Sequence, residues 1–225
     1  MKTISLLIII LILCACTSTN INEKEEFTVD LNSQQIHLGE IDLQLDRVFG
    51  GLRREPVTVI LFPREDAVCL TFRHDIVTYH QFWSRDGREL FLEALAQYNL
   101  DFTARTIESQ NARRTRQIYG VVEGFLIWRT HRLSTQASAN MDIGLGYAFK
   151  ERRPYFTVYQ GKAEFKEPNA SQNEITISPV NMYFTRAQAA ELAVFFRQSY
   201  LDEIIAQNRG GRIIQSSTEI EKDDY

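Results

Sequence analysis

Strict alternation of apolar residues with polar or small residues over positions 140–149 is the feature that most constrains the fold. Apolar side chains stand at every second position from Met141 to Phe149. Successive side chains of a β-strand point to opposite faces of a sheet, so a period of two predicts a strand with one buried face. Burial on one face is typical of antiparallel sheets, and the chain must therefore contain further strands that pair with this one.

Further segments on both sides of this run have strand-like patterns. They are residues 27–31, 41–48, 57–62, 68–73, 75–83, 116–132, 155–165 and 174–183. The run 57–62 is apolar apart from Thr58 and ends at Pro63. Residues 75–83 are interpreted as continuing that sheet after a bend, which gives four or five strands before the first helix. Gly144 and Gly146 are predicted to let the sheet curve or to let another backbone segment approach.

Two amphipathic helices are predicted. The first, over about residues 84–98, begins with a serine N-cap and places its apolar residues along one face. The second, over about residues 185–208, begins with Thr185, which stands at capping-box spacing from Gln188. Gly210-Gly211 is predicted to end this helix.

The two helices follow similar segments. Trp83-Ser84-Arg85 and Phe184-Thr185-Arg186 each place an aromatic residue, a hydroxyl cap and an arginine before an apolar stripe. The predicted fold class is therefore α+β: curved antiparallel sheets with two helices, either as a tandem duplication of one sheet-then-helix unit or as two unrelated capped helices. In its order of elements the chain resembles the PUR and Whirly nucleic-acid-binding proteins. None of their sequence motifs occurs here, so the resemblance concerns architecture alone.

The N-terminus combines a lysine, a short apolar run over residues 4–13 and a cysteine-containing end. A helix that spans a bilayer needs about 20 apolar residues, so this run is too short and instead has the shape of an export signal. Leu13, Ala15 and Cys16 resemble the lipobox of bacterial lipoproteins, although Cys14 departs from the small residue that is commoner at its position. The resemblance implies cleavage before Cys16 and attachment of a lipid such as palmitate to that cysteine.

This interpretation divides the chain into five parts. They are a signal peptide (1–15), a lipidated cysteine with a flexible tether (16–26), a first strands-plus-helix unit (27–101), a second unit (102–210) and an acidic tail (211–225). Acidic residues exceed Lys and Arg by 29 to 25, giving a net charge of −4. This balance gives no indication of a nucleic-acid-binding protein overall.

Cys69 is the thiol that remains in the body of the protein once Cys14 leaves with the signal and Cys16 carries lipid. An internal disulfide is then excluded. Cys69 lies in a predicted strand with no neighbouring residue that would lower its pKa, so a buried, inert thiol is expected rather than a nucleophile.

His74 and His80, with Asp75 and Tyr79 between them, form the densest group of potential ligands. In one extended strand the two imidazoles would share a face and could bind a metal if a third ligand came from elsewhere. Two structural histidines near a bend are the simpler interpretation. No residue is predicted to be catalytic or to bind a metal, and no cofactor is expected.

Residues 100–153 carry nine Lys and Arg against five Asp and Glu. Arginine suits carboxylate and phosphate partners because its planar guanidinium donates two parallel hydrogen bonds. The candidate anion-binding residues are Arg113, Arg114, Arg116, Arg129 and Arg132. Arginines that only solubilise strand edges and loops are the alternative.

The sequence therefore predicts a lipid-anchored cell-envelope protein with a non-catalytic binding or structural role, its body in the periplasm or at the cell surface. Its partners would be the membrane, through the lipid, and a protein or an anionic polymer; no intracellular nucleic acid is expected. A small metal-dependent hydrolase that uses His74 and His80, and anionic-polymer binding through the arginine-rich segment, are the alternatives.

Overall fold

The computed structural model of the 225-residue chain describes residues 27–47, 50–108, 112–130, 136–165 and 175–220. The predicted signal peptide, Cys16 and the tether lie outside the described residues, as do Arg132 and the last five residues of the predicted acidic tail.

Eight antiparallel strands pair side by side in a closed barrel. In barrel order they are β1 (Ile36–Asp46), β2 (Leu52–Phe62), β3 (Ala67–His74), β4 (Val77–Trp83), β5 (Gly120–Thr130), β6 (Gln136–Lys150), β7 (Arg153–Gln160) and β10 (Val180–Phe184), which returns to pair with β1. The α+β class with antiparallel strands is confirmed, but the prediction of separate curved sheets is wrong. Because β4 pairs with β5 and β10 pairs with β1, the two halves join at both seams and neither leaves an open edge.

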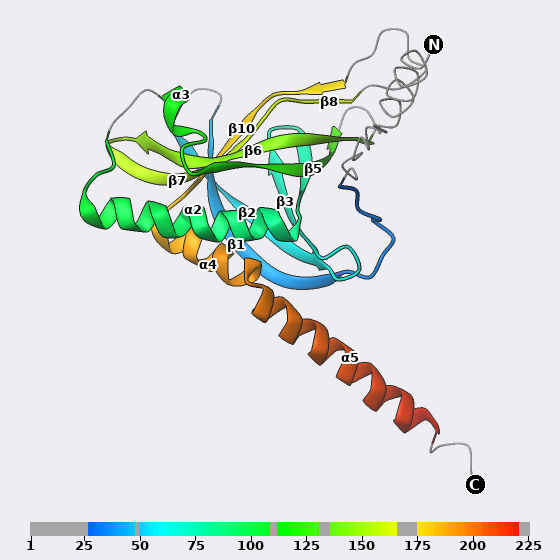
Figure 1. Cartoon of the computed structure of the whole chain (residues 1–225). Helices are drawn as coiled ribbons and strands as arrows, with labels where there is room; N and C mark the ends of the chain where they lie inside the picture. The colour runs from blue at the N-terminus through cyan, green and yellow to red at the C-terminus, as the bar shows by residue number, and fades with distance from the viewer. Residues whose placement is uncertain (1–26, 48–49, 109–111, 131–135, 166–174, 221–225) are drawn as a thin grey trace, which may run out of the picture.

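The inner face of the barrel forms the main hydrophobic core. The alternation over residues 140–149 is confirmed as a strand pattern, since Met141, Ile143, Leu145 and Tyr147 are all buried within this core. Helices α2 (Arg85–Ala104) and α4 (Arg186–Phe196) run along the underside of the barrel in Figure 1 and pack their apolar faces into the same core. The barrel interior is thus filled by side chains and closed by helices.

Aromatic rings hold the two helices to the barrel. The Trp83 ring lies 5.9 Å from Phe91 of α2 and 5.2 Å from Phe196 of α4, and these two phenyl rings lie 4.9 Å from each other. Offset and edge-on aromatic contacts at such separations contribute about 0.5–1.5 kcal/mol each beyond their burial. The last residue of β4 is therefore where both helices meet the barrel.

Both predicted helix starts are confirmed. The Ser84 hydroxyl accepts a hydrogen bond from the backbone N–H of Gly87, and Thr185 and Gln188 form the predicted capping box. Because these side chains satisfy amides that have no partner inside the helix, they determine where each helix begins.

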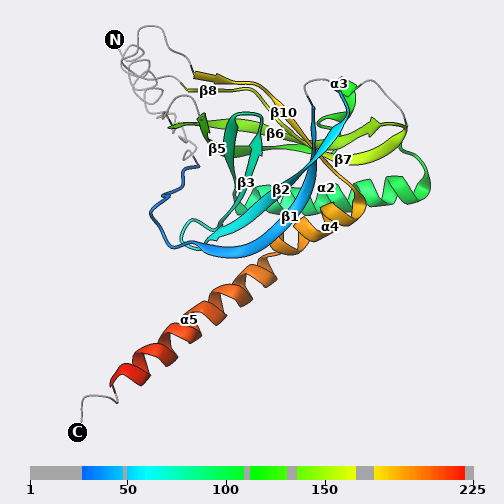
Figure 2. The same cartoon turned by 180° about the vertical axis from the view of Figure 1, so that it is seen from behind.

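The predicted end of the second helix is wrong. Helix α4 ends at Phe196, Arg197 is extended with a ψ of 124°, and α5 (Gln198–Ile220) continues through the glycine pair. Glycine lowers helix stability by about 1 kcal/mol per residue but does not forbid the helical conformation. Helix α5 projects away from the barrel (Figures 1 and 2). Among the described residues, no helix is long and apolar enough to cross a membrane.

Residues 27–31 form no strand, contrary to the prediction. They cross the outer face of the barrel, where Phe27 packs edge-on against Phe125, and contribute to a second hydrophobic cluster with Phe62 and Phe82. This cover explains why Ile60 and Phe62 are apolar although they face outward, while Val57, Val59 and Leu61 of the same strand face the main core. Figure 2 shows this segment leading into β1.

One short helix and two short strands complete the described chain. Helix α3 (Ala112–Thr115) precedes β5, and strands β8 (Ala163–Phe165) and β9 (Ile175–Ile177) form a separate two-stranded sheet between β7 and β10.

Candidate functional site

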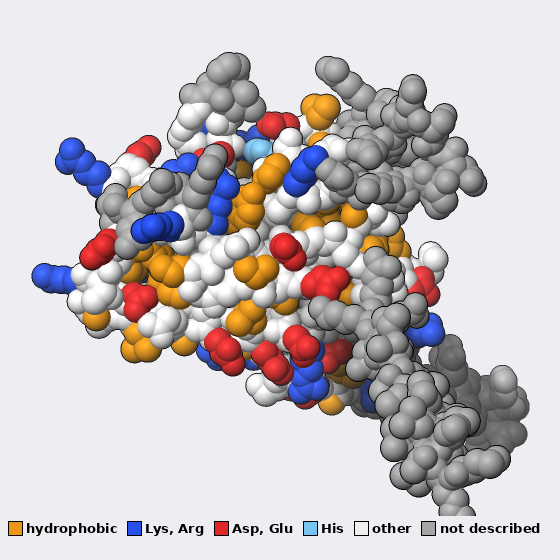
Figure 3. All heavy atoms as spheres, turned by 45° about the horizontal axis from the view of Figure 1, so that its top comes forward, with side chains coloured by type: hydrophobic (Ala, Val, Ile, Leu, Met, Phe, Trp, Pro, Cys, Tyr) orange, Lys and Arg blue, Asp and Glu red, His pale blue; other side chains and the backbone are white. Residues whose placement is uncertain are grey.

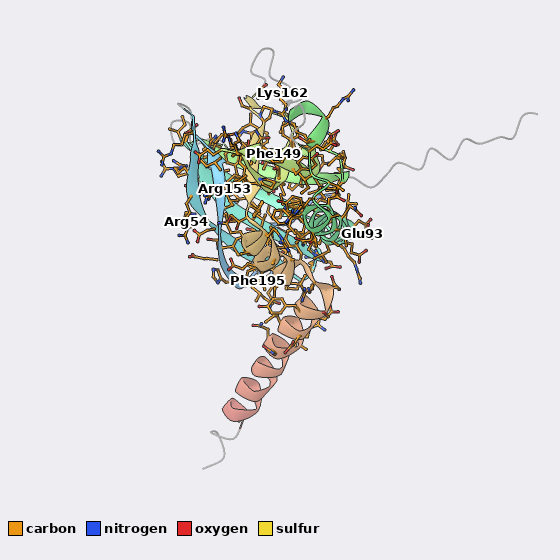
Figure 4. The ribbon with its side chains drawn as sticks, turned by 90° about the vertical axis from the view of Figure 1, so that its left-hand side faces the viewer. Arg54, Glu93, Phe149, Arg153, Lys162 and Phe195 are labelled. Carbon is orange, nitrogen blue, oxygen red and sulfur yellow. The ribbon has the colours of Figure 1, made fainter. Side chains whose placement is uncertain are left out.

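A polar cavity of about 330 Å³ opens on the outer face of the barrel, over β1, β10, β7 and β6. It is lined by Asp46, Thr115, Arg116, Tyr147, Ala148, Phe149, Lys150, Thr157, Asn181 and Tyr183. Figure 4 faces this end of the molecule and shows Phe149 and Arg153, on either side of the β6–β7 turn, above Phe195 of α4. The polar cavity thus lies at the end of the molecule where β6 turns into β7.

Asp46, the last residue of β1, is the hydrogen-bonding centre of the polar cavity. Its carboxylate accepts hydrogen bonds from Lys150 Nζ at 2.5 Å, from the Tyr183 hydroxyl at 2.7 Å and from Asn181 Nδ2 at 3.4 Å. Burial by itself would raise the pKa of Asp46, but these hydrogen bonds and the charge of Lys150 outweigh it and hold the pKa below its usual range. Asp46 is therefore ionised at neutral pH.

The phenol of Tyr183 is fixed by the same contacts. Burial, followed by the hydrogen bond to the Asp46 carboxylate, raises the pKa of Tyr183 well above its ordinary value. The Lys150 ammonium also lies 4.6 Å from the centre of the Tyr183 ring. Lys150 is thus held both by a carboxylate and by an aromatic face.

Arg116 supplies a second cation to the polar cavity. Its guanidinium lies 4.5 Å from the centre of the Tyr159 ring, and none of the described residues offers it a carboxylate in an ion pair. The cavity therefore contains two cations, Arg116 and Lys150, against one carboxylate, Asp46. Lys and Arg side chains also gather in the upper left of Figure 3, at the end of the molecule where Figure 1 places α3.

Two glycines of β6 allow Arg116 to reach this position. A Cβ atom on Gly146 would lie 1.7 Å from the carbonyl oxygen of Thr115, and one on Gly144 would lie 2.7 Å from that of Arg116. The prediction that these glycines admit another backbone segment is confirmed. Since the backbone N–H of Tyr119 also donates to the Leu145 carbonyl at 3.0 Å, the segment after α3 lies directly on β6 and forms a wall of the polar cavity.

The arginines predicted to bind anions are distributed over different places. Arg116 lines the polar cavity, Arg114 is exposed on α3, and Arg129 lines another cavity over β2 to β5. The side chain of Arg113, like all of Arg132, lies outside the described residues. The anion-binding role of each arginine stays a prediction.

The two histidines do not share a face. Asp75 and Ile76 form a tight turn between β3 and β4, with Asp75 at a φ of 54°. Residues 77–83 continue the sheet as a separate antiparallel strand, so His74 and His80 do not lie in one extended strand. His80 pairs with Thr71, whereas His74 pairs with Val77 on the opposite face of the sheet. One ion cannot reach imidazoles on both faces, so the geometric premise of the predicted pair is wrong; the hydrolase itself stays a prediction. Within the described residues no group of three or more His, Cys, Asp or Glu is placed to hold a metal ion.

Cys69 is buried, as predicted. Burial raises the pKa of its thiol to about 12, and the weak contact between its sulfur and the Thr71 hydroxyl at 3.7 Å only partly opposes this. A thiol that stays protonated at neutral pH is a poor nucleophile.

Sequence reasoning missed Asp46, Tyr183 and Asn181. Asp46 stands at a polar position of the alternating segment 41–48, where an ordinary solvent-exposed carboxylate is expected. It is 135 residues from Asn181 and 137 from Tyr183, and only closure of the barrel brings β1 and β10 together. No local pattern in the sequence indicates this contact.

The structure is thus of the α+β fold class, with side chains packed inside the barrel and a polar cavity on its outer face. The chain belongs to a bacterial family described as "Uncharacterised Treponema protein", whose family model matches residues 21–203. No curated protein matches the chain, and no solved structure does.

Proposed function

We propose that this chain is a lipid-anchored protein of the bacterial cell envelope with a non-catalytic binding role, and that the polar cavity binds an anionic group. The leader that ends just before Cys16 supports the anchor. The observation that carries the binding role is the excess of cations in the polar cavity, where Asp46 offsets Lys150 and Arg116 is left to attract an anion.

The chemistry of the cavity favours a carboxylate or phosphate group as ligand. The guanidinium of Arg116 offers a planar pair of donors, and its cation–π contact with Tyr159 at 4.5 Å helps to hold it in place. Lys150 and the Tyr183 hydroxyl are already engaged with Asp46, so they shape the cavity and restrict the ligand to groups that approach Arg116.

The ionisation of the described nucleophiles supports binding rather than catalysis. Burial raises the pKa of Cys69 to about 12 and that of Tyr98 to about 12. A catalytic nucleophile or base is usually adjusted toward neutral pH, in the opposite direction to these shifts.

A second candidate function is binding of an anionic polymer, favoured by the exposed arginines near the cavity. Arg114 on α3 and Arg152 and Arg153 at the β6–β7 turn are all exposed. A polymer would contact several of these side chains together, and its affinity would depend strongly on salt.

We also infer that the two halves of the barrel derive from one duplicated unit. Each half has four barrel strands followed by a helix, and Ser84 and Thr185 cap those helices at equivalent places, one residue after the fourth strand of the half. This order supports the duplication suggested by the similar segments 83–85 and 184–186.

The lipid anchor predicts that radiolabelled palmitate enters the wild-type protein in a bacterial host and does not enter Cys16→Ala. Cys14→Ala is the matched control, because it places a more usual small residue in the middle of the lipobox and keeps the acceptor cysteine. It should be labelled like the wild type. Equal labelling of Cys16→Ala would show that the anchor is absent or lies elsewhere.

The binding role predicts that Arg116→Gln weakens binding of inorganic phosphate, measured by isothermal titration of the full chain, by about tenfold or more, since a hydrogen bond to a charged group contributes about 1.5–3 kcal/mol. The control Arg114→Gln should change phosphate affinity by less than about twofold, because an exposed charge contributes little at a distance. If Arg114→Gln instead lowers salt-sensitive retention on heparin as much as Arg116→Gln does, the ligand is a polymer. Unchanged phosphate and heparin binding in Arg116→Gln would contradict the proposal.

A further inference from the structure

A further cavity, of about 280 Å³, lies between the β3–β4 turn and the segment 176–180, where β9 leads into β10. We call it the turn cavity. It shares no lining residue with the polar cavity, so the two can be tested separately, and it plays no part in the function proposed above.

The floor of the turn cavity belongs to the main core. Tyr79 pairs with Phe72 on β3 and with Trp128 on β5, and the rings of Tyr79 and Phe72 stack at 5.1 Å between their centres. His74 stands two residues beyond Phe72 on the same face of β3, so its imidazole continues this inner row into the cavity. Because Tyr79 and Trp128 are buried, the accessible surface of the cavity belongs to its walls and rim.

The walls and rim combine apolar and polar groups that are exposed. Ile76 is 46% exposed although its side chain is large and apolar, and Pro179 on the opposite segment is exposed as well. The carboxylate of Asp75 and the hydroxyls of Thr176 and Ser178 stand beside them, also on exposed residues. The turn cavity therefore offers accessible apolar surface next to hydrogen-bond acceptors.

The charge of the turn cavity is opposite to that of the polar cavity. Its lining includes the carboxylate of Asp75, whose side chain is 51% exposed, and no Lys or Arg is among the described residues that line it. His74 Nε2 lies 3.8 Å from Asp75 Oδ2, which is beyond hydrogen-bond distance. Arg73 donates to the backbone carbonyl of Asp75, not to its carboxylate. The carboxylate is thus held by neither neighbour.

Two polar groups lie deeper in the cavity. Burial, followed by the charge of Asp75, raises the pKa of Tyr79, so its phenol stays neutral and its oxygen can accept a hydrogen bond. His74 Nδ1 is buried and has no hydrogen-bond partner among the described residues. Native proteins leave few buried polar atoms unpaired, so this atom indicates that the end of the barrel is not packed for stability alone.

We infer that the turn cavity binds the ammonium group of a small aliphatic amine. The ammonium pairs with the Asp75 carboxylate, and the alkyl body covers Ile76 and Pro179. Two features carry this assignment: an accessible carboxylate with no lining Lys or Arg among the described residues, and an exposed apolar rim beside it. Hydrogen bonds between an ammonium and a carboxylate are about twice as strong as those between neutral groups, and covering exposed apolar surface adds to the affinity.

The test is isothermal titration of the full chain with pentylammonium, and with 1-pentanol as a neutral ligand of the same chain length. Pentylammonium should bind at least about tenfold more tightly, a difference of about 1.4 kcal/mol. Asp75→Asn should abolish this preference, because it removes the charge, and asparagine tolerates the φ of 54° as aspartate does.

Glu89→Gln is the matched control for the loss of charge. It removes a negative charge from a side chain that is 58% exposed on α2, outside the turn cavity, and should leave the preference for pentylammonium unchanged. Equal affinity for the two ligands in the wild type, or a preference that survives Asp75→Asn, would overturn the assignment.

Position within the molecule is tested by a variant and by a measurement on the wild type. Ser178→Trp adds bulk at an exposed position of the lining and should weaken both ligands by about tenfold or more. In the wild-type chain, pentylammonium should shift the imidazole NMR signals of His74, assigned by their absence from His74→Gln. The signals of His37, exposed on β1, should stay in place. Binding that leaves the signals of His74 unmoved would show that the amine binds outside the turn cavity.

Discussion

Arg88→Met is expected to lower the free energy of unfolding by about 1.5–3 kcal/mol, because it removes the charged hydrogen bonds of a buried guanidinium while its partner Asp66, 39% exposed, can be hydrated. Arg88 is 1% exposed, and its guanidinium donates to the backbone carbonyl of Asp66 at 2.6 Å, to the Asp66 carboxylate at 2.7 Å and to the Gln198 side chain at 2.7 Å. It thereby ties α2 to the β2–β3 turn and to the start of α5. Methionine fills much of the volume but leaves these acceptors without their donor.

Arg85→Met is the matched control for this prediction. Arg85 approaches the same Asp66 carboxylate at 3.9 Å, but its side chain is 55% exposed, and an exposed ion pair contributes at most about 1 kcal/mol. Denaturant unfolding followed by circular dichroism measures both variants. Similar losses in Arg88→Met and Arg85→Met would show that burial of Arg88 is not what stabilises this junction.

Gly146→Ala is expected to lower the free energy of unfolding by about 3 kcal/mol, at the upper end of what overpacking usually costs. The added methyl group would lie 1.7 Å from the carbonyl oxygen of Thr115, so the segment after α3 must move away from β6. Because that segment carries Arg116 into the polar cavity, phosphate affinity should fall together with stability.

Gly87→Ala makes the same chemical change where the nearest neighbour is a side chain that has to move by only a few tenths of an ångström. A Cβ on Gly87 would meet its nearest neighbour, the Val122 side chain, at 3.3 Å, and alanine is favoured over glycine in a helix by about 1 kcal/mol. Its stability should stay within about 1 kcal/mol of the wild type, measured by the same unfolding experiment. Retention of full stability and phosphate binding in Gly146→Ala would mean that the segment after α3 is not held by close packing on β6.

Local features of the sequence were sufficient to predict where each helix begins and which face of β6 is buried. The hydroxyls at Ser84 and Thr185 satisfy the first free amides of their helices whatever the surroundings, so both helix starts could be predicted. Alternation over residues 140–149 likewise identified β6 and its buried face. The glycine pair 210–211 did not predict the end of the last helix correctly, because each glycine lowers helix stability by only about 1 kcal/mol and a helix can continue through it.

Tight turns without glycine or proline, and contacts between distant segments, could not be predicted from local patterns in the sequence. The turn at Asp75 and Ile76 contains no glycine or proline, so the hairpin that separates His74 from His80 was taken for a bend. The cluster of Asp46, Tyr183 and Asn181 was missed because its members lie at opposite ends of the chain.

The sequence by itself determined the periodicity of the strands, the start of each helix and the antiparallel α+β class. Only the structure decided that Gly144 and Gly146 admit another backbone segment, which the sequence had left open beside sheet curvature. Only the tertiary structure decided that the two halves close into one barrel, and which polar groups line its outer cavities. The physical reason is that caps and alternation depend on neighbours within a few residues, whereas barrel closure and cavity composition depend on hydrogen bonds between strands far apart in the chain.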